Sequence, residues 1–239
     1  AAARSVRPAA GGGTAGGADP ASRIRERAVG ALGDRGFLRG GSSARLVRPS
    51  AATVRAAAAP VEPGDTVRYR FAVGPGLEVA CEDTSQVVTA VVRYAGRREM
   101  LAEDVDAPSG GFTPATWSEL GRDVDEVIVP TDSAFFGAPA DIDGNGRVTY
   151  LFTPRVNRLT PPNSPSFLAG FFLPLDLVDS GDEAGSGLSG EDGQSCPASN
   201  EGEIIYMATA DPEGQFGTAR RVDQAIRQAR SIGTHELEH

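Results

Sequence analysis

The chain has 239 residues, of which 40% are hydrophobic and 23% charged, enough to bury a core in one large or two small domains. Its 30 glycines and 17 prolines argue against a helical bundle and favour a loop-rich fold. The formal net charge of -9 makes nucleic acid an unexpected partner, and no apolar run of about 18 residues is present to span a membrane.

The first 60 residues are rich in Ala, Gly, Arg and Ser, which offer too little apolar surface to offset the entropy lost on ordering. We therefore predict that residues 1–60 form a flexible leader or the remnant of a pro-segment. Within them, Ile24, Ala28, Ala31 and Leu32 recur at helical spacing. This spacing indicates one short helix inside the leader.

The amino-acid composition changes after residue 60, and residues 61–110 are predicted to form a β-rich segment. Apolar and arginine side chains alternate over residues 65–73, and residues 86–96 are β-branched and bounded by turn residues. Both stretches predict strands.

Residues 111–239 combine helical and strand patterns and are expected to form the N-terminal part of a catalytic domain. A short helix is predicted to open at Thr113 with Pro114 in its first turn, followed by a buried strand over residues 127–130. The fold class that these patterns predict is α+β. Further strands are expected at Val148–Phe152, 171–174 and Ile204–Met207, and a closing helix with an apolar stripe at Val222, Ala225, Ile226, Ala229 and Gly233.

The two cysteines, Cys81 and Cys196, lie too far apart in sequence to be a short metal-binding or redox pair. Two alternatives remain open from the sequence. They form one long-range disulfide in a secreted protein, or they are two unpaired buried thiols.

Both histidines of the chain lie in the final six residues, THELEH. On a helix, His235 and His239 project from nearly the same face, where two imidazole nitrogens can bind one zinc ion at roughly 2.0 to 2.1 Å. Glu236 is rotated by about 100° from His235, which suits a general base acting on a water molecule. The pattern therefore indicates metal-assisted hydrolysis of peptide bonds.

A chance match to H-E-x-x-H on a charged helix end is the bland alternative, because the pattern is short. With only two histidines in the chain, placing both at this spacing around a glutamate has a chance on the order of one in a thousand. The zinc interpretation is therefore favoured.

A second motif is DIDGNG, in which Asp141, Asp143, Asn145 and Gly146 match the opening of a calcium loop. Its twelfth position is Phe152 where an EF-hand has a bidentate glutamate, so calcium binding requires another carboxylate from elsewhere. The alternative is a turn without metal, in which Asp141 and Asn145 accept hydrogen bonds from nearby backbone amides.

Four stretches occur in one order: FFGAPADIDGNGRVTYLFTPRVN, GFF at residues 170–172, SNEGEIIYMATADPEG and HELEH. Together they resemble the hyicolysin-type bacterial secreted zinc metallopeptidases. The similarity runs from about residue 65 to the end of the sequence. It implies a zincin-like domain in which a mixed sheet packs on the helix that carries the motif.

The resemblance implies a role for each residue that matches the family's motif. His235 and His239 become zinc ligands and Glu236 the general base, while the third protein ligand is expected downstream of His239. The chain is therefore expected to be a truncated, and by itself weakly active, endopeptidase acting on proteins or peptides outside the cell. The family also implies an edge strand that lines the substrate cleft, which by position would be Glu203, Ile204, Ile205, Tyr206 and Met207.

An acidic side chain between residues 176 and 192 is an alternative source of the third zinc ligand. This stretch contains Asp176, Asp179, Asp182, Glu183, Glu191 and Asp192. A solvated surface loop is the simpler interpretation of so many carboxylates, and we favour it.

Two other functions compete with the peptidase. The first is a non-catalytic extracellular module that uses the DIDGNG loop for calcium-dependent binding or adhesion. The second is a folded envelope protein in which the histidine motif arose by chance.

Overall fold

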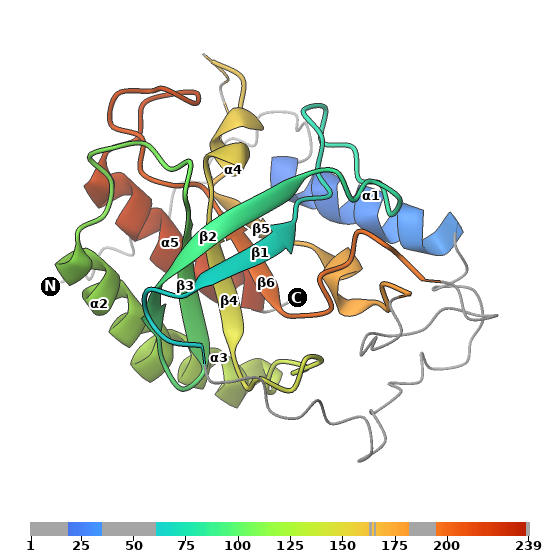
Figure 1. Ribbon diagram of the computed structural model, residues 1–239, viewed down its shortest axis with the longest axis horizontal. Coiled ribbons are helices and arrows are strands. Elements are labelled where there is room, and N and C mark those ends of the chain that lie inside the picture. The colour runs from blue at the N-terminus through green and yellow to red at the C-terminus, as the bar shows by residue number, and fades with distance from the viewer. Residues whose placement is uncertain (1–18, 35–60, 163, 165, 182–194, 238–239) are drawn as a thin grey trace, which may run out of the picture.

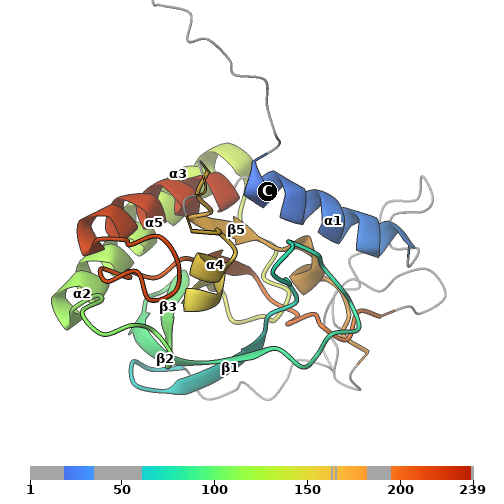
Figure 2. The same ribbon diagram turned by 90° about the horizontal axis from the view of Figure 1, so that it is seen from above.

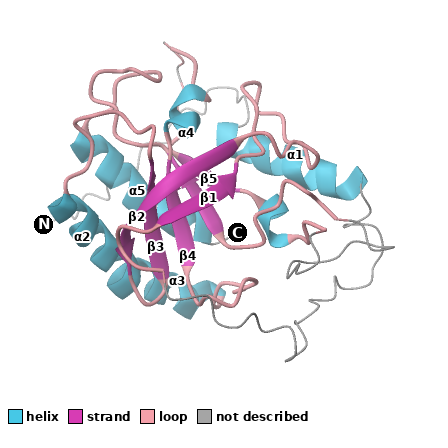
Figure 3. Cartoon of the chain, viewed as in Figure 1, coloured by secondary structure: helices cyan, strands magenta, loops and turns pink. Residues whose placement is uncertain are grey.

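The computed structural model describes residues 19–34, 61–162, 164, 166–181 and 195–237. They form a mixed six-stranded sheet with helices packed around it, an α+β architecture (Figure 1, Figure 3). The strands are β1 (Thr66–Arg70), β2 (Val87–Ala95), β3 (Glu99–Asp104), β4 (Val148–Phe152), β5 (Gly170–Phe172) and β6 (Ile204–Met207).

The described residues also form five α-helices and two short helical turns. No helix among these residues has the length and apolar character needed to cross a membrane. The helical elements are α1 (Pro20–Asp34), α2 (Pro114–Asp123), the π-helical η1 (Val124–Ile128), α3 (Val129–Phe136), α4 (Pro154–Arg158), the 3₁₀-helical η2 (Pro174–Leu177) and α5 (Val222–Leu237).

The strand order is β1-β2-β3-β4-β6-β5. β1, β2 and β3 form an antiparallel meander, β3, β4 and β6 run parallel, and β5 returns antiparallel to β6. Residues 61–110 and 111–239 therefore contribute to one sheet, joined where β3 pairs with β4. The strands predicted at Val148–Phe152 and Ile204–Met207 have the expected bounds.

The two faces of the sheet bury separate clusters because successive side chains of a strand point to opposite sides. On one face, Tyr150 and Phe152 of β4 pack with helical residues that include Trp117 and Ala229. On the other face, Leu151 and the neighbouring strands pack with α1 and the loops around β5. The sheet is thus covered on both sides, and α5 lies on the face that also carries α2 and α3.

The N-terminus of α2 forms as the sequence predicts. Thr113 is extended and its Oγ1 accepts a hydrogen bond from the backbone N–H of Thr116 at 3.2 Å, while Pro114 occupies the first turn. These are the usual features of a helix start.

The buried strand predicted for residues 127–130 is wrong, because the segment is helical and spans the end of η1 and the start of α3. Val124 and Val129 are buried while Val127 is 58% exposed, which is a helical and not a strand pattern of burial. Asp125 fixes this turn by accepting hydrogen bonds from the backbone N–H groups of Arg97 and Arg98.

The helix expected inside the leader is α1, and it is not a loose segment. Its residues Ala21, Ile24, Ala28 and Leu32 are buried in the core that also contains β5 and η2. In Figures 1 and 2, α1 lies beside β5, next to the C-terminal end of α5. The remainder of the leader falls outside the described residues.

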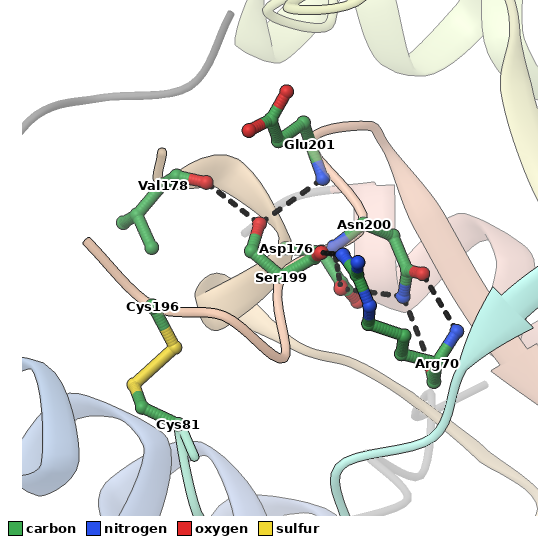
Figure 4. Close-up of a disulfide and its surroundings, with 8 residues drawn as sticks. All are labelled: Arg70, Cys81, Asp176, Val178, Cys196, Ser199, Asn200 and Glu201. Carbon is green, nitrogen blue, oxygen red and sulfur yellow. Dashed lines mark hydrogen bonds between the residues drawn. A yellow bond between two sulfur atoms is a disulfide. The ribbon is translucent and has the colours of Figure 1, made fainter. Parts of the chain in front are cut away.

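Cys81 and Cys196 form a disulfide that joins segments 115 residues apart, which decides between the two alternatives left by the sequence. The loop after it is fixed by Ser199, whose Oγ donates to the carbonyl of Val178 at 2.6 Å and accepts from the N–H of Glu201 at 3.0 Å (Figure 4). The covalent link therefore holds the chain that leads into β6.

The buried carboxylate of Asp176 contacts this loop through Asn200. Oδ2 of Asp176 accepts a hydrogen bond from the hydroxyl of Tyr206, and Oδ1 accepts from Nδ2 of Asn200, each at 2.8 Å. Oδ1 of Asn200 in turn accepts from the N–H of Arg70 at 2.7 Å (Figure 4). Burial raises the pKa of Asp176 to about 7, against the lowering effect of these hydrogen bonds.

Candidate functional site

Helix α5 brings the histidine motif to the sheet. Its residues Ala225, Ala229, Gly233 and Glu236 are buried, as a stripe with helical spacing requires. A Cβ added at Gly233 would lie 2.9 Å from Cε1 of Tyr150, so the absence of a side chain allows the helix to approach β4 closely. The predicted stripe is therefore confirmed at its three small residues, and it extends to the glutamate of the motif.

The residues of the motif differ in exposure. His235 is exposed, whereas Glu236 is only 2% exposed. His239 lies outside the described residues, so the described part of the motif supplies one of its two imidazoles. The four acidic residues between 182 and 192 also lie outside.

The carboxylate of Glu236 is held by two segments that are remote in sequence. Nη1 of Arg25, on α1, donates to Oε1 at 3.2 Å and to Oε2 at 2.9 Å. The backbone N–H of Phe172, on β5, donates to Oε2 at 3.0 Å. The candidate general base therefore lies where α1, α5 and β5 meet.

The expected edge strand needs correction. β6 is paired with β4 on one side and β5 on the other, and all of Ile204–Met207 is buried. Within the described residues, the strand at this end of the sheet with a neighbour on one side only is β5. The N–H of Phe172 faces away from the ladder toward Glu236, so the edge beside the motif is β5.

Glu203, expected beside the edge strand, has a different position. Its carboxylate meets those of Asp141 and Asp143, and one oxygen from each lies within 4.8 Å of the others. The backbone N–H of Ile142 donates to Oε1 of Glu203 at 2.8 Å. The DIDGNG loop therefore gains the extra carboxylate that its sequence lacks, from a residue far along the chain.

The side-chain oxygen of Asn145, in the same loop, is used in a backbone contact. Its Oδ1 accepts a hydrogen bond from the N–H of Arg147 at 2.5 Å, and Asp141 Oδ1 accepts from the N–H of Gly146 at 2.7 Å. These are the backbone contacts expected of a turn without metal, and they occur together with the convergence of carboxylates.

Sequence reasoning missed Arg25 and the main chain of Phe172. Arg25 follows Ile24 on α1 and is one of several arginines on that helix, so nothing in the pattern marks it. The role of Phe172 is carried by its backbone, which leaves no trace in side-chain chemistry. Asp176, an alternative zinc ligand by sequence, is instead engaged by Tyr206 and Asn200.

Comparisons with known proteins identify no family: a scan against protein-family models finds no match, and a search of the curated proteins finds no relative. Any account of function therefore depends on the residues themselves and on their geometry.

Proposed function

We propose that the chain belongs to the catalytic domain of a secreted zinc endopeptidase. The observation that carries the proposal is the position of Glu236, whose carboxylate accepts the outward N–H of Phe172 on the sheet's edge strand β5. A strand edge that is free of other contacts binds an extended peptide through main-chain hydrogen bonds, and at β5 this requires that the segments now covering it move away. A peptide paired with β5 would pass beside the glutamate of the motif.

A zinc ion held by His235 and His239, with a further ligand, would polarise the scissile carbonyl and acidify a water molecule. Glu236 takes the proton from the attacking water and returns it to the leaving amine, so the carboxylate ends the cycle as it began. The buried sheet and α5 hold this carboxylate in place, while the edge of β5 sets the direction of the peptide.

The disulfide between Cys81 and Cys196 supports the proposed extracellular location, because such bonds persist in oxidising compartments. The sequence resemblance to hyicolysin-type peptidases supports the same class of reaction. The competing calcium-dependent module draws on the acidic cluster at Glu203. That cluster shares no residue with the histidine motif, so the two sites are compatible in one protein.

Zinc content tests the proposal without relying on turnover. The full natural chain, dialysed against zinc and then against buffer, should retain about one zinc per molecule. The variants His235→Ala and His239→Ala should each lose it, whereas Glu236→Gln should keep it because this residue is the base and not a ligand. Equal zinc content in all four proteins would show that the motif does not bind the metal.

A further inference from the structure

Three carboxylates meet at the start of two parallel strands. Asp141 and Asp143 belong to the loop that leads into β4, and Glu203 immediately precedes β6. The two strands pair from near their starts, with Thr149, the second residue of β4, opposite Ile204, the first residue of β6. Like charges at this separation repel, so the arrangement needs a compensating positive charge.

One oxygen of the Glu203 carboxylate lacks any compensating contact among the described residues. The residue is 7% exposed, and its Oε2 is buried without a hydrogen-bond partner among the described residues. Burial, together with the charges of Asp143 and Asp141, raises the pKa of Glu203. A buried carboxylate oxygen without a donor is costly, and bound cations commonly satisfy such groups.

Arg147, the basic residue of the DIDGNG loop, does not donate a hydrogen bond to Oε2 of Glu203. Nη1 of Arg147 donates to the carbonyl of Val61 at 3.2 Å. The loop's own amides are used as well, because Gly146 donates to Asp141 Oδ1 and Ile142 to Glu203 Oε1. Neither of these two hydrogen bonds involves Oε2 of Glu203, which stays without a donor among the described residues.

We propose that Asp141, Asp143 and Glu203 bind one calcium ion. All three donors are carboxylate oxygens, which calcium accepts in irregular arrangements of six to eight ligands. Asp141 and Asp143 are exposed, so water can complete the shell on their side. Asn145 is not among the converging ligands, because its Nδ2 donates to Oδ2 of Asp143 and its Oδ1 accepts from the N–H of Arg147.

The ion would fasten the loop to β6 and so fix the register of β4 and β6. β6 in turn positions β5, whose Phe172 contacts Glu236. Calcium is therefore expected to stabilise the fold, and it does so whether or not the histidine motif is catalytic.

Thermal unfolding of the full chain with calcium chloride tests this site. The melting temperature should rise by about 5 °C or more between a chelator and millimolar calcium, because the ion binds the folded state. Glu203→Gln should abolish the rise, yet without calcium it should be at least as stable as the natural protein because one repelling charge is gone.

Glu126→Gln is the matched control, since Glu126 is exposed and lies outside the cluster. It should keep the full calcium response. The site is disproved if the natural protein shows no shift at millimolar calcium, or if Glu203→Gln shifts as much as the natural protein.

A separate observation concerns α1. Its buried stripe packs it against β5 and η2, while Arg25 contacts both carboxylate oxygens of Glu236. α1 therefore lies against the strand whose edge the proposed substrate would need. The carboxylate side chain of Glu236 is fully buried and accepts two hydrogen bonds from Arg25 and one from Phe172, so bulk water does not reach it while α1 is in place.

We infer that α1 is a built-in inhibitor that must leave before peptide hydrolysis begins, an inference that rests on the proposed function. α1 covers β5, and its Arg25 forms an ion pair with Glu236, the proposed base. Arg25 is 17% exposed and the carboxylate of Glu236 is fully buried, so water screens the pair weakly.

Initial rates of casein hydrolysis by the full natural chain test this role of α1. Arg25→Gln should raise the rate at least about tenfold, and Arg23→Gln, an exposed site on the same helix, should leave it unchanged. Equal rates in active natural and Arg25→Gln proteins would disprove inhibition and leave the peptidase intact. Absence of hydrolysis in every form, including after proteolytic removal of α1, would disprove both.

Discussion

Arg25 and Glu236 form an ion pair across 211 positions of the sequence, with Nη1 2.9 Å from Oε2. The pair joins the first helix that the structure describes to the last. Because the carboxylate side chain is fully buried, its solvation depends on these donors and not on water.

We expect the pair to contribute to stability. Arg25→Gln should lower the free energy of unfolding by about 1.5 to 3 kcal/mol, because it removes charged hydrogen bonds from a buried acceptor. In a Glu236→Gln background the same change should cost clearly less. Urea denaturation of the four proteins gives the coupling energy, and Arg23→Gln should stay within about 0.5 kcal/mol of the natural protein. Additive losses would argue against a direct interaction.

The disulfide should contribute as a long-loop crosslink. Replacing Cys81 and Cys196 together by serine should destabilise the protein by about 2 to 5 kcal/mol, since the link joins residues 115 positions apart. A reducing agent should lower the melting temperature of the natural protein but not that of the double variant. If reduction affects both proteins equally, the effect does not come from this bond.

Glu99 gives a pH dependence with a defined sign. It is fully buried, and neither carboxylate oxygen has a hydrogen-bond partner among the described residues. Burial, followed by the neighbouring carboxylate of Asp125, raises the pKa of Glu99 from 4.5 to about 9. The folded state then holds the proton more tightly than the unfolded chain, so its stabilising contribution is complete below about pH 4.5 and is lost as pH rises through about 9.

Glu99→Gln removes this titration. Relative to the natural protein, the variant should become more stable between about pH 7 and pH 9, by up to about 1.4 kcal/mol per pH unit. This window lies above the pKa of about 7 for Asp176, which titrates with the same sign. Chemical denaturation at several pH values measures the difference. A difference that does not change with pH would contradict the assignment.

Two glycines in helices should respond in opposite ways to alanine. At Gly30 on α1, an added Cβ would have no heavy atom within 4 Å. Gly30→Ala should therefore stabilise the protein by about 0.5 to 1 kcal/mol. At Gly233 a Cβ would lie 2.9 Å from the ring of Tyr150, so Gly233→Ala should destabilise by about 1 to 3 kcal/mol. Urea denaturation distinguishes them, and gains at both positions would show that α5 can move away from β4.

The elements that the sequence predicts correctly have a local pattern that agrees with their structure. Val148–Phe152 and Ile204–Met207 are short apolar runs next to turn residues, and α5 has small residues at helical spacing. The strand predicted at residues 127–130 is wrong because β-branched side chains favour strands, whereas here the buried positions follow a helix. β3 escapes prediction because Glu99, Glu103 and Asp104 make a buried strand look polar.

The candidate site divides in the same way. The spacing of the histidine motif and of Asp141 and Asp143 is local and can be read directly. Glu203 joins the acidic cluster through tertiary contacts, as its bond to Ile142 across 61 positions shows. The place of Arg25 likewise depends on how α1 docks, which no periodicity encodes.

Peptide hydrolysis with and without the proposed base tests the central claim most directly. The full natural chain, freed of α1 by limited proteolysis and loaded with zinc, should hydrolyse casein, and Glu236→Gln treated in the same way should be slower by about 100-fold or more. The zinc content of the two proteins should be equal. If Glu236→Gln hydrolyses casein as fast as the natural protein, Glu236 is not the general base and the proposed mechanism is wrong.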